Sequence, residues 1–405
     1  MHTPRYHILV RYNEIFLKGQ NRAFFEKQLA HNIKLCLKRH NISYERVNRH
    51  RGRLIIHLKE DIYEKSECLS KVFGIASFSP AVEIKRSTPN LMEEIKTKAL
   101  QLLKEKGLSS SSSFKIAAKR SDKKFPIDSV HINEQVGAFI VEETGARVQL
   151  QNSEFYLGIE IVEQGEIYLF TEKIKGPGGL PTGSSGKLIC LISGGIDSPV
   201  AAWLMMRKGC RVTLLHLDQS PYYSEGDLDR VKKVCSKLAE YYYGEPLKLC
   251  IIKTGRIMQE FVARGSKYVC VLCKSNMLRI ASKLAEEEGA SAVVDGSSLA
   301  QVASQTITNL EVEESASSKP VLRPLIGLSK EEIIQIAKSI GTYDISIASD
   351  VKCTALPKHP ATQSSLERIK EIESKMPLRR LIEEALTKKE LILFGQDEKG
   401  RSRIL

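Results

Sequence analysis

At 405 residues the chain exceeds what one hydrophobic core normally serves, so two or three domains are expected, and the lack of any apolar run of ~18 residues excludes a membrane-spanning protein. The net charge of +13 is concentrated in residues 1–60, where 13 Lys and Arg face 4 Glu and no Asp, a pattern that favours RNA as partner over a merely solvated basic surface. Nine cysteines, an odd number, and the absence of an apolar leader indicate a cytoplasmic protein with reduced thiols rather than a disulfide framework.

The first 60 residues predict a small α+β unit. Periodicity predicts a strand at Tyr6–Arg11, a loop at Lys18–Asn21, a helix at Arg22–Arg39 and a second strand at Leu54–Leu58. The segment Arg11-Tyr-Asn-Glu-Ile-Phe-Leu-Lys-Gly-Gln-Asn-Arg22 is similar to the signature that opens the tRNA 4-thiouridine synthetases. In that family a ferredoxin-like domain precedes an RNA-binding one, so the resemblance implies a ferredoxin-like domain over residues 1–60.

Residues 61–172 predict a second α+β unit. The expected elements are a short helix before Val72, a strand at Ala81–Lys85, a helix at Leu91–Lys106, a flexible serine loop at Ser109–Ser113, a strand at Phe114–Ser121, a helix at Ile132–Glu142 and strands near Val148 and Ile167. Their order resembles a THUMP domain, which implies a grip on the acceptor end of tRNA. Lys115 and Lys119 on one face of the strand, and Arg120 on the other, are the candidate tRNA-binding residues, with a solvated sheet surface as the alternative.

The Gly-, Pro- and Ser-rich stretch 173–186 is predicted to be a linker with a hinge character. Residues 187–405 then alternate between strands and helices. The predicted elements are strands 187–192, 211–217, 247–252 and 292–294 and helices starting at Pro199, Leu228, Ile257 and Leu272. This order predicts an α/β domain with a doubly wound parallel sheet, whose ligand lies at the carboxyl ends of the strands.

Ser193-Gly-Gly-Ile-Asp-Ser198 follows the first of these strands and is typical of an anion-binding loop. The two glycines permit a tight turn, and we expect Ser198 to be the N-cap of a helix that Pro199 opens at its first position. Backbone N–H groups at a helix start suit a phosphate or pyrophosphate. An ordinary Gly-Gly turn is the alternative. The full string resembles the PP-loop of the ATP pyrophosphatases, which cleave ATP between the α and β phosphates.

Other segments are assigned to the nucleotide site by position and by the resemblance. His216 and Leu217 end the second strand, Gly296 follows a later strand, and Gln305 could read an amide or purine edge. Ser297 and Ala300 depart from the family pattern in this segment, so no carboxylate acts at 297. With the loop itself, the expected ATP-binding residues are Leu191, Ile192, Ser193, Gly194, Gly195, Asp197, Ser198, His216, Leu217, Lys274, Gly296 and Gln305.

Lys330 lies in the first turn of a helix that Ser329 and Glu332 are predicted to cap as a capping box. A cation is unfavourable at that end of a helix by ~0.3–1 kcal/mol, which makes sense if a phosphate lies nearby. An exposed surface lysine is the alternative. The resemblance places a catalytically important lysine at this position.

Cys270 and Cys273 form a Cys-x-x-Cys pair, and Cys353 lies in a segment that resembles the family's catalytic-cysteine stretch. Three thiolates can hold an iron–sulfur cluster with one iron left open to exogenous sulfide. Zinc or structural thiols, and a Cys353 persulfide resolved by Cys270 or Cys273, are the alternatives.

The resemblance covers nearly the whole chain and points to the branch of the family without a rhodanese domain. It implies that Mg-ATP adenylates the C4 oxygen of the uridine at position 8 of tRNA and that sulfur then displaces AMP, with Asp197, Lys330 and Cys353 as catalytic residues. The implied partners are tRNA, a sulfur donor (sulfide or a cysteine desulfurase) and a thiamin-pathway sulfur carrier protein, with a homodimer and no membrane. Another PP-loop tRNA-modifying activity (thiolation at a different base, or amidation) and a non-catalytic RNA-binding chaperone are the competing hypotheses.

Overall fold

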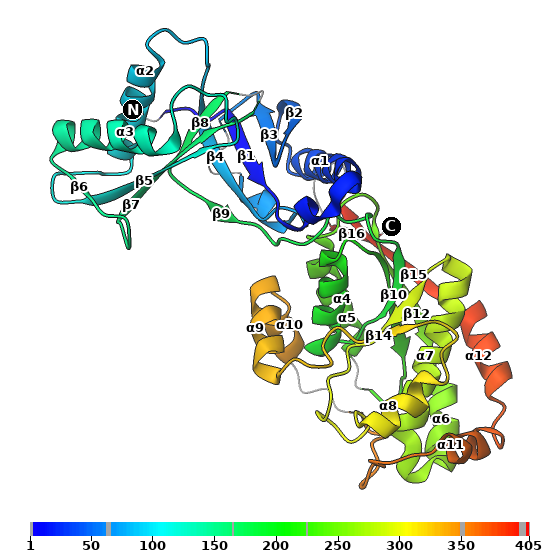
Figure 1. Ribbon diagram of the computed structural model, residues 1–405. Helices are drawn as coiled ribbons and strands as arrows, with labels where there is room; N and C mark the ends of the chain where they lie inside the picture. The colour runs from blue at the N-terminus through cyan, green and yellow to red at the C-terminus, as the bar shows by residue number, and fades with distance from the viewer. Residues whose placement is uncertain are drawn as a thin grey trace. The chain divides into compact units, whose positions relative to one another are not determined.

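The computed structural model describes residues 3–61, 66–163, 166–223, 226–348, 353–396 and 402–404 (Figure 1). The chain divides into an N-terminal unit, Met1–Pro181, and a C-terminal unit, Thr182–Leu405, and each is described by itself. Within the described ranges, no helix combines the length and the apolar character that crossing a membrane would need.

A nine-stranded sheet runs through the N-terminal unit in the order β2-β3-β1-β4-β8-β7-β5-β6, with β9 beside β4. Its strands are β1 His7–Arg11, β2 Tyr44–His50, β3 Arg53–Leu58, β4 Ser77–Ile84, β5 Ser113–Arg120, β6 Arg147–Val148, β7 Phe155–Ile161, β8 Ile167–Phe170 and β9 Ile174–Lys175. Its helices are the 3-10 helices η1 Glu14–Asn21 and η2 Ser66–Lys71 and the α-helices α1 Arg22–Arg39, α2 Leu91–Glu105 and α3 Ser129–Thr144. Strand β4 pairs with β1 on one side and with β8 on the other, so the ferredoxin-like and THUMP halves share one sheet.

Two local predictions for this unit were wrong, and two of its longer strands were not predicted. The expected loop at Lys18–Asn21 belongs to the 3-10 helix η1. Strands β2 and β7 were not predicted. The sequence of β2 shows no alternation of apolar and polar residues, and its side chains are exposed or half-buried. The serine run is a closed turn rather than a flexible loop, because Ser109 N donates to Ser112 Oγ at 3.2 Å and Ser112 is buried.

A buried ion-pair network joins the two halves of the N-terminal unit. The Nε atoms of Arg11 and Arg53 donate to the two carboxylate oxygens of Glu160, at 2.7 and 2.6 Å. Burial would raise the pKa of Glu160, but the two guanidinium groups hold it below its usual value. Because Arg11 and Arg53 lie on β1 and β3 whereas Glu160 lies on β7, the network fixes one half of the sheet against the other.

The C-terminal unit contains a seven-stranded sheet in the order β14-β13-β10-β11-β12-β15-β16. Its strands are β10 Lys187–Leu191, β11 Arg211–Asp218, β12 Leu247–Lys253, β13 Ala292–Val294, β14 Val321–Leu322, β15 Glu390–Gln396 and β16 Ser402–Ile404. Its helices are α4 Asp197–Arg207, α5 Asp227–Ala239, α6 Gly255–Arg264, the 3-10 helix η3 Ser266–Tyr268, α7 Val269–Glu288, α8 Ile307–Glu314, α9 Lys330–Ile340, α10 Tyr343–Ile347, α11 Leu366–Glu373 and α12 Leu378–Thr387.

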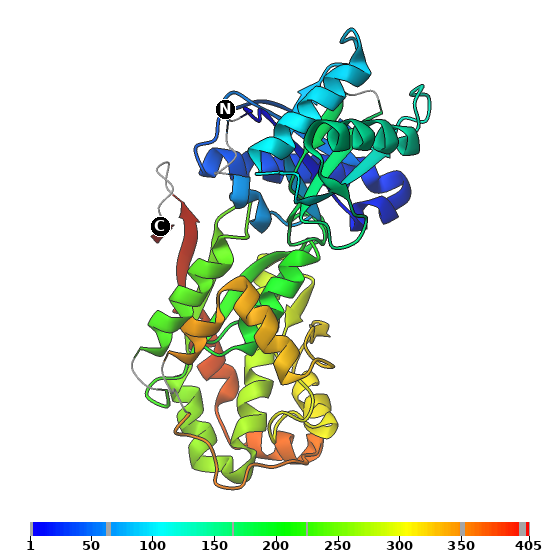
Figure 2. The same ribbon diagram turned by 90° about the vertical axis from the view of Figure 1, so that its left-hand side faces the viewer.

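Strands β10 to β14 pair in parallel, which confirms the predicted doubly wound sheet. The chain leaves β10 toward β11 and returns on its other side as β13, so the strand order reverses at β10 and a ligand is expected there, at the carboxyl ends. Strand β15 was not predicted. It pairs antiparallel with β12, carries β16, and extends the sheet as the red strand near the C-terminus in Figure 2.

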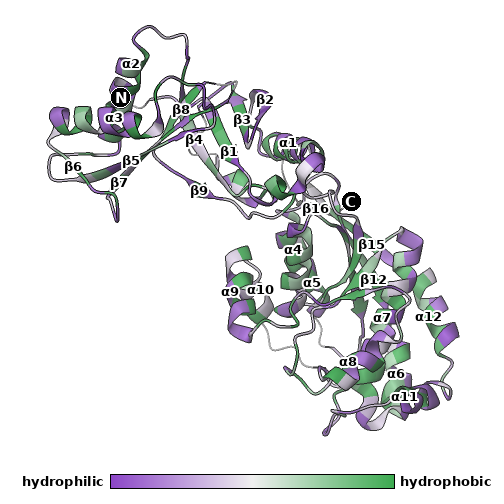
Figure 3. Cartoon of the chain, in the orientation of Figure 1, coloured by the Kyte–Doolittle hydropathy of each residue, from purple (hydrophilic) through white to green (hydrophobic). Residues whose placement is uncertain are grey.

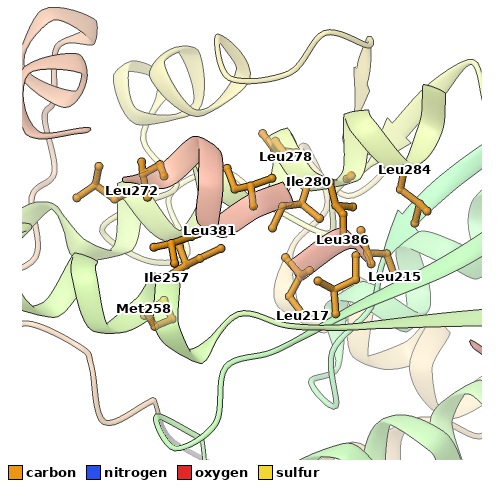
Figure 4. Packing of buried hydrophobic residues seen from close by; sticks show 14 of the residues in the cluster. Leu215, Leu217, Ile257, Met258, Leu272, Leu278, Ile280, Leu284, Leu381 and Leu386 are labelled. Atoms are coloured by element: carbon orange, nitrogen blue, oxygen red, sulfur yellow. The ribbon is translucent and has the colours of Figure 1, made fainter. Parts of the chain in front are cut away.

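Helices cover both faces of this sheet (Figure 1): α4 and α5 pack on one face, and α6, α7 and α12 on the other. Strand β11 contributes Leu215 and Leu217 to the core under α6, α7 and α12, which also contains Leu278 and Leu381 (Figure 4). The helices carry hydrophobic residues on one side and hydrophilic residues on the other, as Figure 3 shows. Burial on both faces explains why the central strands contain runs of consecutive apolar residues.

Candidate active site

The loop between β10 and α4 is closed by hydroxyl groups. Ser193 N donates to Ser198 Oγ at 2.8 Å, and the hydroxyl oxygens of these two serines lie 3.0 Å apart. Gly195 N donates to Ser193 Oγ at 3.3 Å. These contacts fold residues 193–198 into a compact turn at the carboxyl end of the first strand of the unit.

The predicted N-cap was wrong. Helix α4 begins at Asp197 with Ile196 as its N-cap residue and no side-chain cap, so Pro199 is its third residue and not its first. The Ser198 hydroxyl accepts from the loop instead of from the helix. Because no side chain caps them, the first N–H groups of α4 are available to an anion, which suits a phosphate better than the predicted arrangement.

Two glycines allow close packing around this loop. A Cβ at Gly194 would lie 2.2 Å from Nε of Arg230, so the glycine lets that guanidinium approach the loop. A Cβ at Gly296 would lie 2.9 Å from Cα and 3.0 Å from N of Ser198, so Gly296 lets the loop after β13 contact the start of α4. Arg230 is held in turn by Asp227, whose carboxylate accepts from Nη2 at 2.8 Å.

A cavity of about 370 Å³ opens above the loop. All twelve residues predicted to bind ATP line it: Leu191, Ile192, Ser193, Gly194, Gly195, Asp197, Ser198, His216, Leu217, Lys274, Gly296 and Gln305. The structure thus gathers segments that lie more than 100 residues apart in the chain. It also adds lining residues that the sequence did not indicate, among them Gln219, Tyr223, Arg230 and Glu313.

His216 is neutral and oriented. Its Nδ1 lies 3.1 Å from the carbonyl oxygen of Ile192, and since a carbonyl only accepts, Nδ1 carries the proton and Nε2 is left as an acceptor. Burial lowers the pKa of His216, which keeps the imidazole uncharged. Its side chain lies at the end of β11, among the apolar residues of the cavity wall.

Lys330 lies next to the loop of residues 193–198. The predicted capping box is confirmed: Ser329 N donates to Glu332 Oε2 at 2.8 Å and Glu332 N to Ser329 Oγ at 3.2 Å. Nζ of Lys330 donates to Asp197 Oδ1 at 2.6 Å, so the first residues of α9 and α4 meet. The carboxylate of Asp197 thereby offsets the repulsion between this ammonium and the positive end of its own helix.

The opposite wall of the cavity carries polar groups that have no protein partner among the described residues. Gln305 Oε1 and both carboxyl oxygens of Glu313 are buried without a hydrogen bond. Burial raises the pKa of Glu313 to about 8. Next to them, Lys274 Nζ donates to Ser297 Oγ at 3.3 Å. Ser297 is the position at which the resembled family has a carboxylate. This wall can therefore offer hydrogen bonds to a ligand.

Cys270 and Cys273 lie in the first turns of α7. Burial raises the pKa of the Tyr223 phenol, and the nearby sulfurs of Cys353, Cys273 and Cys270 raise it further. Gln219 Nε2 donates to Cys273 Sγ at 2.9 Å, and Gln219 and Tyr223 both line the cavity. Burial raises the pKa of Cys273 to about 12, so its sulfur is a thiol at neutral pH. Through Gln219, Cys273 thus contacts a residue that lines the cavity.

The segment around Cys353 is only partly described, since residues 349–352 lie outside the described ranges. Thr354 N donates to the carbonyl oxygen of Tyr222 at 3.0 Å, which ties the residue after Cys353 to the connection between β11 and α5. In the described part of the chain, the three sulfurs are not among the groups whose ligand atoms all lie within 4.8 Å of one another. They are therefore more widely spread than the ~3.8 Å sulfur spacing of a tetrahedral zinc site.

The predicted tRNA-binding residues lie together on β5 in the N-terminal unit. Lys119 is exposed and Lys115 half-exposed, and both point to the same face of the sheet. Arg120 differs, because its Nη1 donates to the carbonyl oxygens of Phe125 and Ile127, at 2.7 and 3.3 Å. Lys173 adds a cation, and burial together with the charges of Arg11 and Lys119 lowers its pKa.

Known protein families match the chain in three consecutive parts. Residues 7–79 match the ThiI ferredoxin-like domain, 90–172 the THUMP domain, and 183–378 the family described as thiamine biosynthesis protein (ThiI).

Several proteins and solved structures are similar to this chain over most of their length. A probable tRNA sulfurtransferase of Methanocaldococcus jannaschii is 42% identical over 92% of this chain and 97% of its own. One of Methanothermobacter thermautotrophicus is 42% identical over 94% and 96%. A crystal structure described as a 4-thiouridine synthetase–RNA complex with bound ATP has a TM-score of 0.84 at 36% identity and covers 96% of this chain and 99% of that one. PH1313 of Pyrococcus horikoshii has a TM-score of 0.66 at 31% identity, over 83% and 99%.

Proposed function

The chain belongs to the tRNA sulfurtransferase (ThiI) family, and from that premise we propose that it is the ATP-dependent enzyme that makes 4-thiouridine at position 8 of tRNA. One observation carries the proposal. The anion-binding loop of residues 193–198 lines the cavity together with Gln219, and the Nε2 atom of Gln219 donates to Cys273 Sγ at 2.9 Å, so a thiol lies directly behind a residue of the cavity wall. A nucleotide-activated carbonyl and a sulfur nucleophile can therefore meet there.

ATP would bind with its phosphates at the uncapped start of α4 and its adenine against Leu191, Leu217 and His216. The Nε2 acceptor of His216 suits an exocyclic amino group. Asp197 and Ser198 fit the magnesium ion of Mg-ATP, since Mg²⁺ is usually held by one or two carboxylates together with substrate phosphates. The magnesium ion would supply charge neutralisation on the phosphates.

In the first step, the O4 atom of uridine attacks the α phosphorus, and pyrophosphate leaves. The N3 proton of the base is released at the same time, because the adenylated base carries a C4=N3 double bond. Negative charge grows on the phosphate oxygens during this displacement. Lys330 and Arg230 lie beside the loop to stabilise it, and the loop N–H groups do so without any rearrangement.

In the second step, sulfur adds at C4, and AMP leaves with the oxygen that was O4. Cys353, with Cys270 and Cys273, is the proposed source of that sulfur. A donor set of three cysteines can hold an iron–sulfur cluster with one iron left open. Such a cluster would supply a site for sulfide. The alternative is that Cys353 carries the sulfur as a persulfide.

Binding of tRNA is assigned to Lys115 and Lys119, with Arg120 contributing through the loop that it holds. The sulfur donor would be sulfide or a cysteine desulfurase. The same proposal includes transfer of sulfur to a thiamin-pathway sulfur carrier protein and a homodimeric assembly. It also includes the domain limits 1–60, 61–172, 173–186 and 187–405.

Anaerobic purification followed by iron and labile-sulfide analysis of the wild type and of Cys273→Ala tests the loading of the thiols. If the wild type contains substoichiometric iron and Cys273→Ala contains the same amount, the proposed cluster is ruled out. A separate assay of Cys353→Ala isolates the steps: this variant should convert ATP to AMP in the presence of tRNA but form no 4-thiouridine. Equal 4-thiouridine yields in both proteins would contradict the role of Cys353.

A further inference from the structure

Two cysteines and a histidine meet in the N-terminal unit, in a part of the chain that none of the site residues above occupies. Cys36 and His40 lie at the end of α1, and Cys68 lies in η2. Each offers one ligand atom, and the three atoms all lie within 4.8 Å of one another. We refer to Cys36, His40 and Cys68 as the Cys₂His cluster.

The local structure explains why these groups converge. Residues i and i+4 of a helix share a face, so Cys36 and His40 point the same way, and His40 ends the helix with its N–H donating to the carbonyl oxygen of Cys36 at 3.1 Å. Sγ of Cys36 lies 3.5 Å from the carbonyl oxygen of Cys68, which brings η2 against this face. The Cys36 side chain is fully buried, whereas His40 is exposed, so the cluster opens to solvent on the histidine side.

From this geometry we propose that the Cys₂His cluster is a zinc site. Two sulfurs and an imidazole nitrogen are the donor atoms that Zn²⁺ prefers, and water or a further ligand would complete four-fold coordination on the open side. The site lies at the carboxyl end of an 18-residue helix, where the backbone carries partial negative charge. Binding replaces the protons of both thiols, so that Zn²⁺ and two Cys–SH give a neutral zinc dithiolate and release two protons.

The other three-ligand group in the described ranges, His7, His57 and Glu83, is a poorer candidate. Its members already have partners: Asn48 Nδ2 lies 3.2 Å from Nε2 of His57, and Tyr168 donates to Glu83 at 2.9 Å. Arg46 also adds a positive charge close enough to lower the pKa of His57, beyond the larger effect of burial. A cation would have to displace these contacts, and a donor set of two imidazoles and a carboxylate lacks the two sulfurs that the Cys₂His cluster offers to Zn²⁺.

The test uses the full chain in a background that removes the other thiol trio, Cys270→Ser/Cys273→Ser/Cys353→Ser. This protein is stripped with a chelator under reducing conditions, given one equivalent of ZnCl₂, desalted and analysed for metal by mass spectrometry. We expect about one zinc per chain in this background. Cys68→Ser added to it should lose most of the bound zinc, and His40→Gln should bind at least ~10-fold more weakly in a competition with a chromophoric chelator.

His31→Gln is the matched control, because it makes the same change at an exposed position of the same helix and should keep full zinc binding. Replacement of zinc by cobalt provides a second measurement, in which the sulfur-to-metal charge-transfer absorption of the background protein should be lost in Cys68→Ser. A zinc-free background protein would overturn the site, and so would equal affinities of His40→Gln and His31→Gln. The free thiols can also be alkylated directly in reduced cell extract. A Cys36–Cys68 disulfide in that protein would overturn the zinc site too, because two sulfurs bonded to each other cannot bind zinc as thiolates. None of these outcomes depends on the proposed sulfurtransferase activity.

Discussion

At the scale of single residues, the pair formed by Lys330 and Asp197 links the two helix starts that flank the phosphate loop. Each residue begins its helix, α9 or α4, and the 2.6 Å contact between them positions the ammonium beside the loop. An ion pair at the surface contributes little to stability, so a cation kept at this place is better explained by a ligand than by folding.

Replacement of Lys330 by methionine should therefore reduce activity and leave the fold intact. We expect AMP and pyrophosphate formation in the presence of tRNA to fall by about 10²–10³-fold, as is typical when one charge-stabilising group is removed. Lys338→Met, at the exposed far end of the same helix, is the control and should retain wild-type turnover. Comparable rates for the two variants would remove Lys330 from the reaction.

Asp197→Ala should abolish pyrophosphate release, because it removes both the proposed magnesium ligand and the partner of Lys330. The measurement is tRNA-dependent pyrophosphate release at saturating Mg-ATP. Unchanged release would show that Asp197 takes no part in the mechanism.

Glu313 should make the stability of the protein depend on pH. Burial raises its pKa to about 8 from an ordinary value of 4.5, so the folded state keeps a proton that the unfolded chain loses. Stability should then fall as the pH rises from about 4.5 to about 8, by at most ~1.4 kcal/mol per pH unit, and the loss should level off above that range.

Urea unfolding of the wild type and Glu313→Gln at pH 5.5, 6.5 and 7.5 measures this effect. The glutamine variant should lose less stability across the series, whereas Glu311→Gln, an exposed neighbour on α8, should follow the wild type. Parallel curves for Glu313→Gln and the wild type would contradict a neutral buried carboxyl.

At the scale of elements, contacts between loops create the cavity, and Gly296 permits a close contact between two backbones. A methyl group there would lie within 3.0 Å of the backbone of Ser198, which cannot move without displacing the start of α4. Gly296→Ala should weaken ATP binding by at least ~10-fold in an equilibrium titration, an effect estimated from the typical 1–3 kcal/mol cost of overpacking. Gly327→Ala, in the same unit but with no atom within 4 Å of the added Cβ, should bind ATP normally.

The sequence predicts elements well where one physical signal dominates. The apolar strands β10 to β13, helix α1 and the Ser329–Glu332 capping box follow from hydrophobic runs and cap chemistry. Strand β2 could not be found, because its Tyr-Glu-Arg-Val-Asn-Arg-His sequence pairs along an exposed edge and needs no apolar face. Strand β15 lies more than 130 residues from its partner β12, so its pairing is a property of the fold and not of the local pattern.

The same limit applies to the site. The twelve residues expected to bind ATP line one cavity. The anion-binding loop was recognised from its glycines and serines after a strand, whereas most of the others were assigned from their place at strand ends and from the family resemblance. Ser198 was misassigned, since its hydroxyl could cap either the helix or the loop and only the geometry decides. Glu313 and Arg230 lie on helix faces whose sequence looks like ordinary solvated surface, so their approach to the cavity had no signal in the sequence.

At the scale of the whole molecule, the positive charge of residues 1–60 and the lysines of β5 predict a salt-dependent grip on tRNA. The double variant Lys115→Gln/Lys119→Gln should bind tRNA more weakly, and the slope of log affinity against log salt should decrease by about 1 for each phosphate that the variant no longer neutralises. Lys104→Gln, an exposed lysine at the end of α2, is the control for charge alone. Identical salt slopes for the double variant and the wild type would place the tRNA elsewhere.

The coupling of nucleotide cleavage to sulfur insertion can be measured in one reaction. Purified protein is incubated anaerobically with magnesium, α-labelled ATP, sulfide and unmodified tRNA transcript, and AMP, pyrophosphate and 4-thiouridine are counted together. The account predicts one AMP and one pyrophosphate for each 4-thiouridine, all at position 8. Formation of 4-thiouridine without AMP, or AMP without any thiolated base in the presence of sulfide, would contradict it.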